Sequence, residues 1–137
     1  MTTMLVGTDT SASADLAVED AARLARDRGA ELLVLYVEPD AAIRAAVDPG
    51  LAWDPLAYLA EIERRFPDVP IRTRVVSGDP AERIVEVAEQ ERAEAIVIGN
   101  RGAHGSRWRV RESVPNIVLR HAPCSVYIVD TRRAQRT

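Results

Sequence analysis

The stretch that decides the fold is AIVIGNRGAHGSRWRVRESVPNIVLRHAPCSVYIVD, residues 95–130. It begins with a short apolar run, residues 95–98, that is rich in β-branched side chains and bounded by Gly99, which is typical of a buried strand. Glycines then recur at every third position, as Gly99, Gly102 and Gly105. A backbone of this composition can adopt positive φ angles and approach a ligand closely. The pattern predicts a strand followed by a candidate phosphate-binding loop.

A helix start follows this loop. Ser113 is a candidate N-cap, Pro115 falls near the first turn, and apolar residues continue at 117–119. The free N–H groups of a helix N-terminus favour an anion, so we expect this helix start and the preceding loop to contribute to one phosphate site. We expect the helix to stop near Pro123 and to lead into a last β-branched strand, Ser125–Val129.

The rest of the chain alternates in the same way. Strands are predicted at residues 4–8, 31–37 and 71–76, the last with one wetter face that is typical of an edge. The first helix is predicted from Ala14 to a C-cap at Gly29, with Thr10, Ser11 and Ser13 as candidate N-caps. Two further helices are predicted from Pro55 to Phe66, and after an N-cap at Asp79 with Pro80 in the first helical position. Residues 38–51 carry several turn signals and are predicted as a loop, in which AAIRAAV at 41–47 is compatible with one or two helical turns.

Five strands alternating with four helices predict an α/β fold, because parallel neighbours need crossover connections that place helices on both faces of the sheet. Ligands of such sheets bind outside the carboxyl ends of the strands, where the strand order reverses. Gly7, Thr8 and Asp9 follow the first strand, and Gly99 follows the fourth. These residues are therefore expected to flank the ligand site.

Composition narrows the class of protein. The 137 residues, 47% hydrophobic and 28% charged, predict a single domain spanning residues 1–137. The net charge is -3, every basic residue except the two histidines is arginine, and no basic run is long enough to suggest a nucleic-acid partner. The single cysteine, Cys124, excludes an internal disulfide and is expected to be a buried small hydrophobe. No apolar run approaches the roughly 18 residues of a membrane span, so we expect no membrane partner and a cytoplasmic location.

Four segments together resemble the universal stress protein family. They are VGTDTSASADLAVEDAARLA at 6–25, LLVLYVEP at 32–39, SGDPAERIVEVAEQERAEAIVIGNRG at 77–102 and SVPNIVLRHAPCSVYIVD at 113–130. The resemblance implies a five-stranded parallel sheet of order 3-2-1-4-5 in the Rossmann-like, adenine-nucleotide alpha-hydrolase-like class. It also implies a homodimer, which we expect to form through the apolar edge strand Ser125–Val129.

The nucleotide-binding branch of that family carries Gly, two residues, Gly, nine residues, then Gly before Ser or Thr. Here the pattern falls on Gly99, Gly102 and Glu112, so a glutamate replaces the third glycine before Ser113. Two like charges about 4 Å apart repel by about 4 kcal/mol near a protein surface, which opposes phosphate binding. The arginines at 101, 107, 109 and 111 can offset this either by pairing with the glutamate or by meeting the phosphates, and the sequence leaves both alternatives open.

By resemblance, the ligand is ATP or another adenine nucleotide, with Mg²⁺ as a candidate companion. Asp9 is expected on the ribose side and the Val37 backbone beside the base. The full candidate set is Gly7, Thr8, Asp9, Val37, Ile98, Gly99, Asn100, Arg101, Gly102, Glu112, Ser113 and Val114. Simpler roles stay open: Asp9 and Ser113 as helix caps, and the glycines as parts of a tight turn.

No catalytic constellation stands out. The complete P-loop pattern is absent, there is no lysine, and His104 and His121 have no partner at metal-ligand spacing. We therefore expect no catalytic residues, no metal site, and at most slow ATP hydrolysis. Two hypotheses remain: a nucleotide-responsive stress module that signals through a dimer to an unidentified protein partner, and a dimeric interaction protein of the same family that binds no nucleotide because of Glu112.

Overall fold

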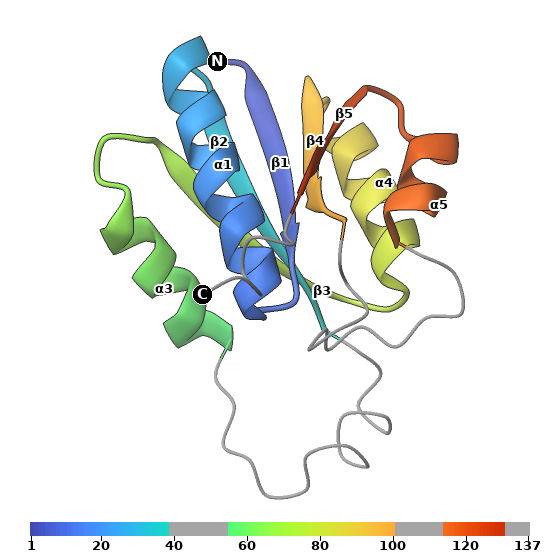
Figure 1. The fold of residues 1–137 in the computed structure, drawn as a ribbon, viewed down its shortest axis with the longest axis horizontal. Coiled ribbons are helices and arrows are strands. Elements are labelled where there is room, and N and C mark those ends of the chain that lie inside the picture. The colour runs from blue at the N-terminus through green and yellow to red at the C-terminus, as the bar shows by residue number, and fades with distance from the viewer. Residues whose placement is uncertain (39–54, 101–113, 131–137) are drawn as a thin grey trace, which may run out of the picture.

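The computed structural model describes residues 1–38, 55–100 and 114–130. In these ranges the chain forms, in order, β1 (Thr3–Thr8), α1 (Ala12–Arg28), β2 (Glu31–Glu38), α3 (Pro55–Arg65), β3 (Ile71–Ser77), α4 (Pro80–Gln90), β4 (Ala95–Gly99), α5 (Val114–His121) and β5 (Ser125–Val129) (Figure 1). The strands form one sheet of order β3-β2-β1-β4-β5, in which every neighbouring pair is parallel. The α/β fold and the strand order expected from the sequence are confirmed.

Helices cover both faces of the sheet (Figure 1). Successive residues of each central strand point to opposite faces, so Val6 packs in the core beneath α1 and α3 while Leu5 packs in the core beneath α4 and α5. Both side chains are fully buried. This explains why the strands appear in the sequence as continuous apolar runs rather than alternating ones.

Helix α1 lies close to the sheet because its buried stripe is small. Ala17, Ala21 and Ala25 are each 0% exposed, whereas Ala14 and Leu24, which the spacing also assigns to the stripe, are only partly buried. The side chain of Ser11 caps the helix by accepting the Ala14 N–H at 3.1 Å.

The predicted start of α4 is confirmed. Asp79 accepts the Glu82 N–H at 3.0 Å, and Pro80 occupies the first turn. Pro80 needs no N–H there, because the first N–H groups of a helix lack intrahelical partners.

The two edges of the sheet differ in character. At β3, the Arg72 guanidinium bridges Glu31 at 2.8 Å and Glu91 at 2.9 Å, as suits a strand with a wet face. At β5, Tyr127 and Ile128 are 47% and 38% exposed.

The loop expected at 38–51 begins one residue late, since Glu38 ends β2, and the remainder lies outside the described residues. Over the described ranges, no helix is both long and apolar enough to cross a bilayer.

Candidate functional site

The predicted site residues that follow β1 and β4 lie at the carboxyl ends of these strands, where the strand order reverses. Strand β1 lies between β2 and β4, and its pairing with β2 continues to Thr8 opposite Tyr36. Its registered pairing with β4 stops earlier, at Val6 opposite Val97. Beyond this point β1 stays paired with β2 and β4 stays paired with β5, so β1 and β4 separate from each other at the carboxyl edge of the sheet. This is the position at which open α/β sheets hold their ligands.

Asp9 follows β1 at this edge, and this acidic residue is only 3% exposed. Its Oδ1 accepts the Ser11 N–H at 2.9 Å and thereby holds the turn that leads into α1. Because Ser11 is the N-cap, the interpretation of Asp9 as the helix cap is wrong. The carboxylate organises the turn before the helix instead.

Thr10 is an N-cap candidate in the sequence, but the structure gives the cap to Ser11 and Thr10 a different role. Its φ is 72°, so a β-branched side chain stands in the left-handed region, which costs on the order of 1–3 kcal/mol. Its N–H donates to the Thr8 hydroxyl at 3.0 Å. Threonine seldom adopts a positive φ, and no local sequence pattern indicates that it does so here.

Tyr58 of α3 reaches the same turn from the α1 and α3 face of the sheet. Its hydroxyl makes a short hydrogen bond to Asp15 Oδ1 and lies 3.4 Å from the Thr8 hydroxyl. Burial and the hydrogen bond to Asp15 raise the pKa of the Tyr58 phenol, so it stays neutral at physiological pH. These partners are 50 and 43 residues from Tyr58 in the chain, so no local pattern joins them.

On the β4 side, Gly99 is the last residue of the strand. The glycines with positive φ in the described ranges are Gly29 and Gly78, so Gly99 does not use the left-handed conformation that its residue type permits. Asn100 is tied to β5, since its N–H donates to the Val129 carbonyl at 3.0 Å. Its position is set by the sheet before any ligand is considered.

The remaining candidates divide into placed and unplaced residues. Val37 is buried in β2 against the α4 side of the core, which leaves its backbone as the part that can contact a base. Val114 begins α5 and is 6% exposed. Arg101, Gly102, Glu112 and Ser113 lie outside the described residues.

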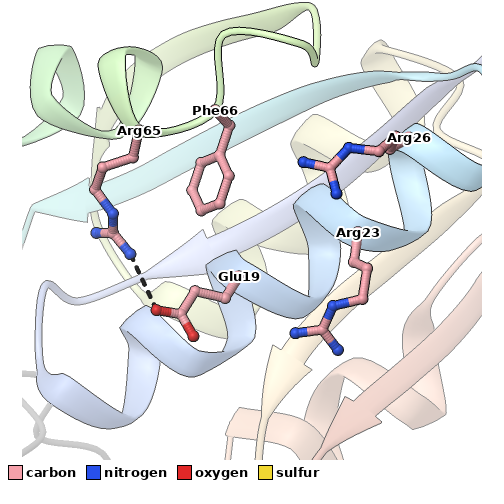
Figure 2. Close-up of a pocket in the computed structure, with 5 residues that line it drawn as sticks. All are labelled: Glu19, Arg23, Arg26, Arg65 and Phe66. Atoms are coloured by element: carbon pink, nitrogen blue, oxygen red, sulfur yellow. Dashed lines mark hydrogen bonds and ion pairs between the residues drawn. The ribbon is translucent and has the colours of Figure 1, made fainter.

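A separate hollow of about 330 Å³ lies between α1 and the end of α3, lined by Glu19, Arg23, Arg26, Arg65 and Phe66 (Figure 2). Its arginines suggest an anion site, but each is already paired. Arg23 pairs with Asp20 at 3.1 Å, Arg26 with Asp68, and Arg65 with Glu19 at 3.2 Å. The ion pairs therefore connect neighbouring segments of the chain, and they neutralise the arginine charges that a phosphate would need.

The described ranges contain no group of three or more His, Cys, Asp or Glu side chains arranged to hold a metal ion. Cys124 is partly buried beside the core of α4 and α5, and burial raises the pKa of its thiol. Cys124 is thus less buried than expected from the sequence, but a raised thiol pKa lowers the thiolate fraction and favours a packing role over a reactive thiol.

Parallel strands, helices on both faces and a polar turn at the strand-order reversal define a Rossmann-like α/β protein. The model of the universal stress protein family matches residues 1–130, and the chain belongs to that family.

Three similar proteins illustrate the relationship. Universal stress protein Rv2005c of Mycobacterium tuberculosis is 31% identical over 134 residues, covering 91% of this chain but only 44% of its own length. The chain thus spans less than half of that mycobacterial relative. Universal stress protein YxiE of Bacillus subtilis is 27% identical, with 92% of this chain and 97% of the relative covered. A solved universal stress protein in complex with cAMP superposes with a TM-score of 0.75 at 28% identity, covering 95% and 97% of the two chains.

Proposed function

We propose that the chain binds an adenine nucleotide at the carboxyl edge of β1 and β4 and acts as a nucleotide-responsive stress module in the cytoplasm. The observation that carries the proposal is the buried carboxylate of Asp9 at the strand-order reversal, where a ligand can reach residues from two strands that have stopped pairing. A relative of matching fold and length in complex with cAMP supports the adenine class.

The chemistry of the edge suits the parts of a nucleotide in a definite order. A carboxylate accepts hydrogen bonds and repels phosphate, so Asp9 serves the ribose hydroxyls. The N-terminus of α5 carries the partial positive charge that phosphates favour, which assigns Val114 and Ser113 to the phosphate end. The base then lies toward β2, beside the backbone of Val37. Gly7, Thr8, Ile98, Gly99, Asn100, Arg101, Gly102 and Glu112 complete the proposed lining.

The proposal includes Mg²⁺ only as a companion of a di- or triphosphate, with Asp9 as the proposed carboxylate ligand of the ion. It includes no catalytic residue and no efficient turnover. Slow ATP hydrolysis is the most that the proposed lining supports.

Calorimetry and thermal unfolding of the purified protein with ATP, ADP, AMP and cyclic AMP, each with and without Mg²⁺, test the proposal. A ligand present at 100 times its dissociation constant stabilises the folded state by about 2.7 kcal/mol, which is readily detected. GTP is the control for adenine preference, and Asp9→Asn should weaken binding of ribose-containing ligands. Absence of heat and of any shift at millimolar adenine nucleotide would refute nucleotide binding.

We also propose a homodimer through β5. The Val129 carbonyl accepts the Asn100 N–H, so the backbone groups of Val129 face β4. Because backbone groups alternate along a strand, those of Val126 and Ile128 face away from the sheet. An exposed apolar edge of this kind is satisfied by a second copy. Light scattering at micromolar concentration should give about twice the 15.1 kDa mass of the chain.

The exposed β5 edge also favours the second candidate function, a dimeric interaction protein that binds no nucleotide because of Glu112. Thermal unfolding with nucleotide distinguishes the two candidate functions. Both require the dimer, but only the first requires a shift in the unfolding temperature when nucleotide is added.

A further inference from the structure

We propose that Tyr58 is a positioning residue that holds the turn after β1 in the strained conformation in which it forms one wall of the nucleotide site. The inference rests on the proposed function for the identity of the ligand. The conformation of the turn itself is tested without a ligand.

The contacts around Tyr58 form a chain of hydrogen bonds whose direction is determined at both ends. The Thr10 N–H can only donate, and it donates to the Thr8 hydroxyl at 3.0 Å. The Asp15 carboxylate can only accept, and it accepts the Tyr58 O–H. The Thr8 hydroxyl must therefore donate to the Tyr58 oxygen, across the longest gap of the chain, 3.4 Å. The Asp15 carboxylate therefore determines the direction of the hydrogen bond from Thr8 to Tyr58.

The carboxylate is itself held by α3. Arg65, one turn after Ile62, approaches Asp15 Oδ2 at 3.6 Å and Glu19 at 3.2 Å, and Figure 2 shows its side chain extending from α3 to Glu19 on α1. Charge-assisted hydrogen bonds are the strong ones, so the Asp15 end is the anchor of the chain. Thr8 and Thr10, at the other end, depend on it.

The turn needs such support because its backbone is strained. Thr10 is left-handed, and two side-chain contacts hold it in that state: Thr8 to the Thr10 N–H, and Asp9 to the Ser11 N–H. Strained residues persist only where their surroundings over-determine them. Removing the Tyr58 hydroxyl releases Thr8 to rotate away from the Thr10 N–H, and the carboxylate of Asp9 is then no longer presented in one position.

Tyr58→Phe isolates this role because α3 keeps its packing. Leu59 and Ile62 are at most 1% exposed and anchor the helix without the hydroxyl. Asp68→Ala is the matched control for general loosening between these helices, since it removes the Arg26 to Asp68 ion pair and leaves the Tyr58 contacts intact.

Amide hydrogen exchange of the ligand-free protein tests the turn. Tyr58→Phe should accelerate exchange of the Thr10 N–H about tenfold, in line with the loss of one hydrogen bond to a charged network. Exchange of the Glu82 N–H, which the Asp79 carboxylate holds, should stay unchanged in the same sample. The Asp68→Ala variant should leave Thr10 exchange as it was. An unchanged Thr10 rate in Tyr58→Phe overturns the inference.

Calorimetry with the adenine nucleotide that binds the unmodified protein tests the consequence. We expect the dissociation constant to rise about tenfold in Tyr58→Phe and to stay within twofold in Asp68→Ala. Faster Thr10 exchange with an unaltered dissociation constant also overturns the positioning role. If the unmodified protein binds no nucleotide, the proposed function fails, and the exchange rate alone then decides whether Tyr58 holds the turn.

Discussion

Replacing Arg92 by glycine should stabilise the protein. Arg92 follows α4 with a φ of 52°, its N–H donates to the Glu89 carbonyl at 3.2 Å, and the Ala93 N–H donates to the Ala88 carbonyl at 2.9 Å. These bonds form a Schellman motif, in which the left-handed position normally holds glycine. Helix α1 ends in the same motif with Gly29 at φ 62°, so the protein contains a favourable and an unfavourable version of one structure.

The magnitude follows from two opposing terms. A left-handed L-residue costs about 1–2 kcal/mol, which glycine relieves. Glycine in turn increases the freedom of the unfolded chain, which costs about 0.4–1 kcal/mol. Arg92 is exposed, so little packing is lost. The net expectation is a gain of about 0.5–1 kcal/mol, or about 2–4 °C in the midpoint of thermal unfolding for a chain of this size.

Gly29→Ala is the matched control, because a Cβ added at Gly29 meets no atom within 4 Å and the change tests the backbone angle alone. It should destabilise by a similar amount. Both variants are compared with the unmodified protein by thermal and urea unfolding. If Gly29→Ala destabilises while Arg92→Gly does not stabilise, the Arg92 side chain makes contacts that outweigh its backbone strain, and the reasoning is refuted.

Four further predictions concern the proposed site and assembly. Glu112→Gly should strengthen ATP binding at least tenfold by calorimetry, since about 4 kcal/mol of repulsion near a phosphate is removed, and an unaltered affinity would mean that the charge is distant or neutralised. Gly102→Val should abolish nucleotide binding with an unchanged circular dichroism spectrum, and persistent binding would contradict the loop assignment. Ile128→Pro should give a monomer or aggregate by light scattering because it removes an outward N–H, whereas Tyr127→Pro should instead disrupt pairing with β4 and lower the unfolding temperature; a dimeric Ile128→Pro variant would rule out the β5 interface. Thr10→Gly should raise the unfolding temperature yet weaken nucleotide binding, because relieving strain also loosens the turn; tighter binding in this variant would contradict a role for that strain.

The elements were predictable because their signals are local. The apolar run at residues 95–98 has strand length and is bounded by Gly99, and the Asp79-Pro80 pair marks a helix start by supplying a cap and a residue that needs no N–H. Alternation of such elements then predicts a parallel sheet with helices on both faces. Gly99 shows the limit of this logic, since glycine permits a left-handed backbone without requiring one, and here it ends a strand.

The sequence by itself determined the α/β class, the family resemblance and the gathering of Asp9 and Gly99 at one edge, because strand length, helix caps and parallel connection depend on neighbouring residues. Only the tertiary structure decided that Thr10 is left-handed, that Ser11 is the N-cap of α1 among the candidates the sequence offers, and that Tyr58 reaches across to Thr8 and Asp15. The Tyr58 contacts join residues more than forty positions apart, and the Thr10 backbone angle is one that its surroundings impose against the preference of the residue. Local propensity carries no information about either.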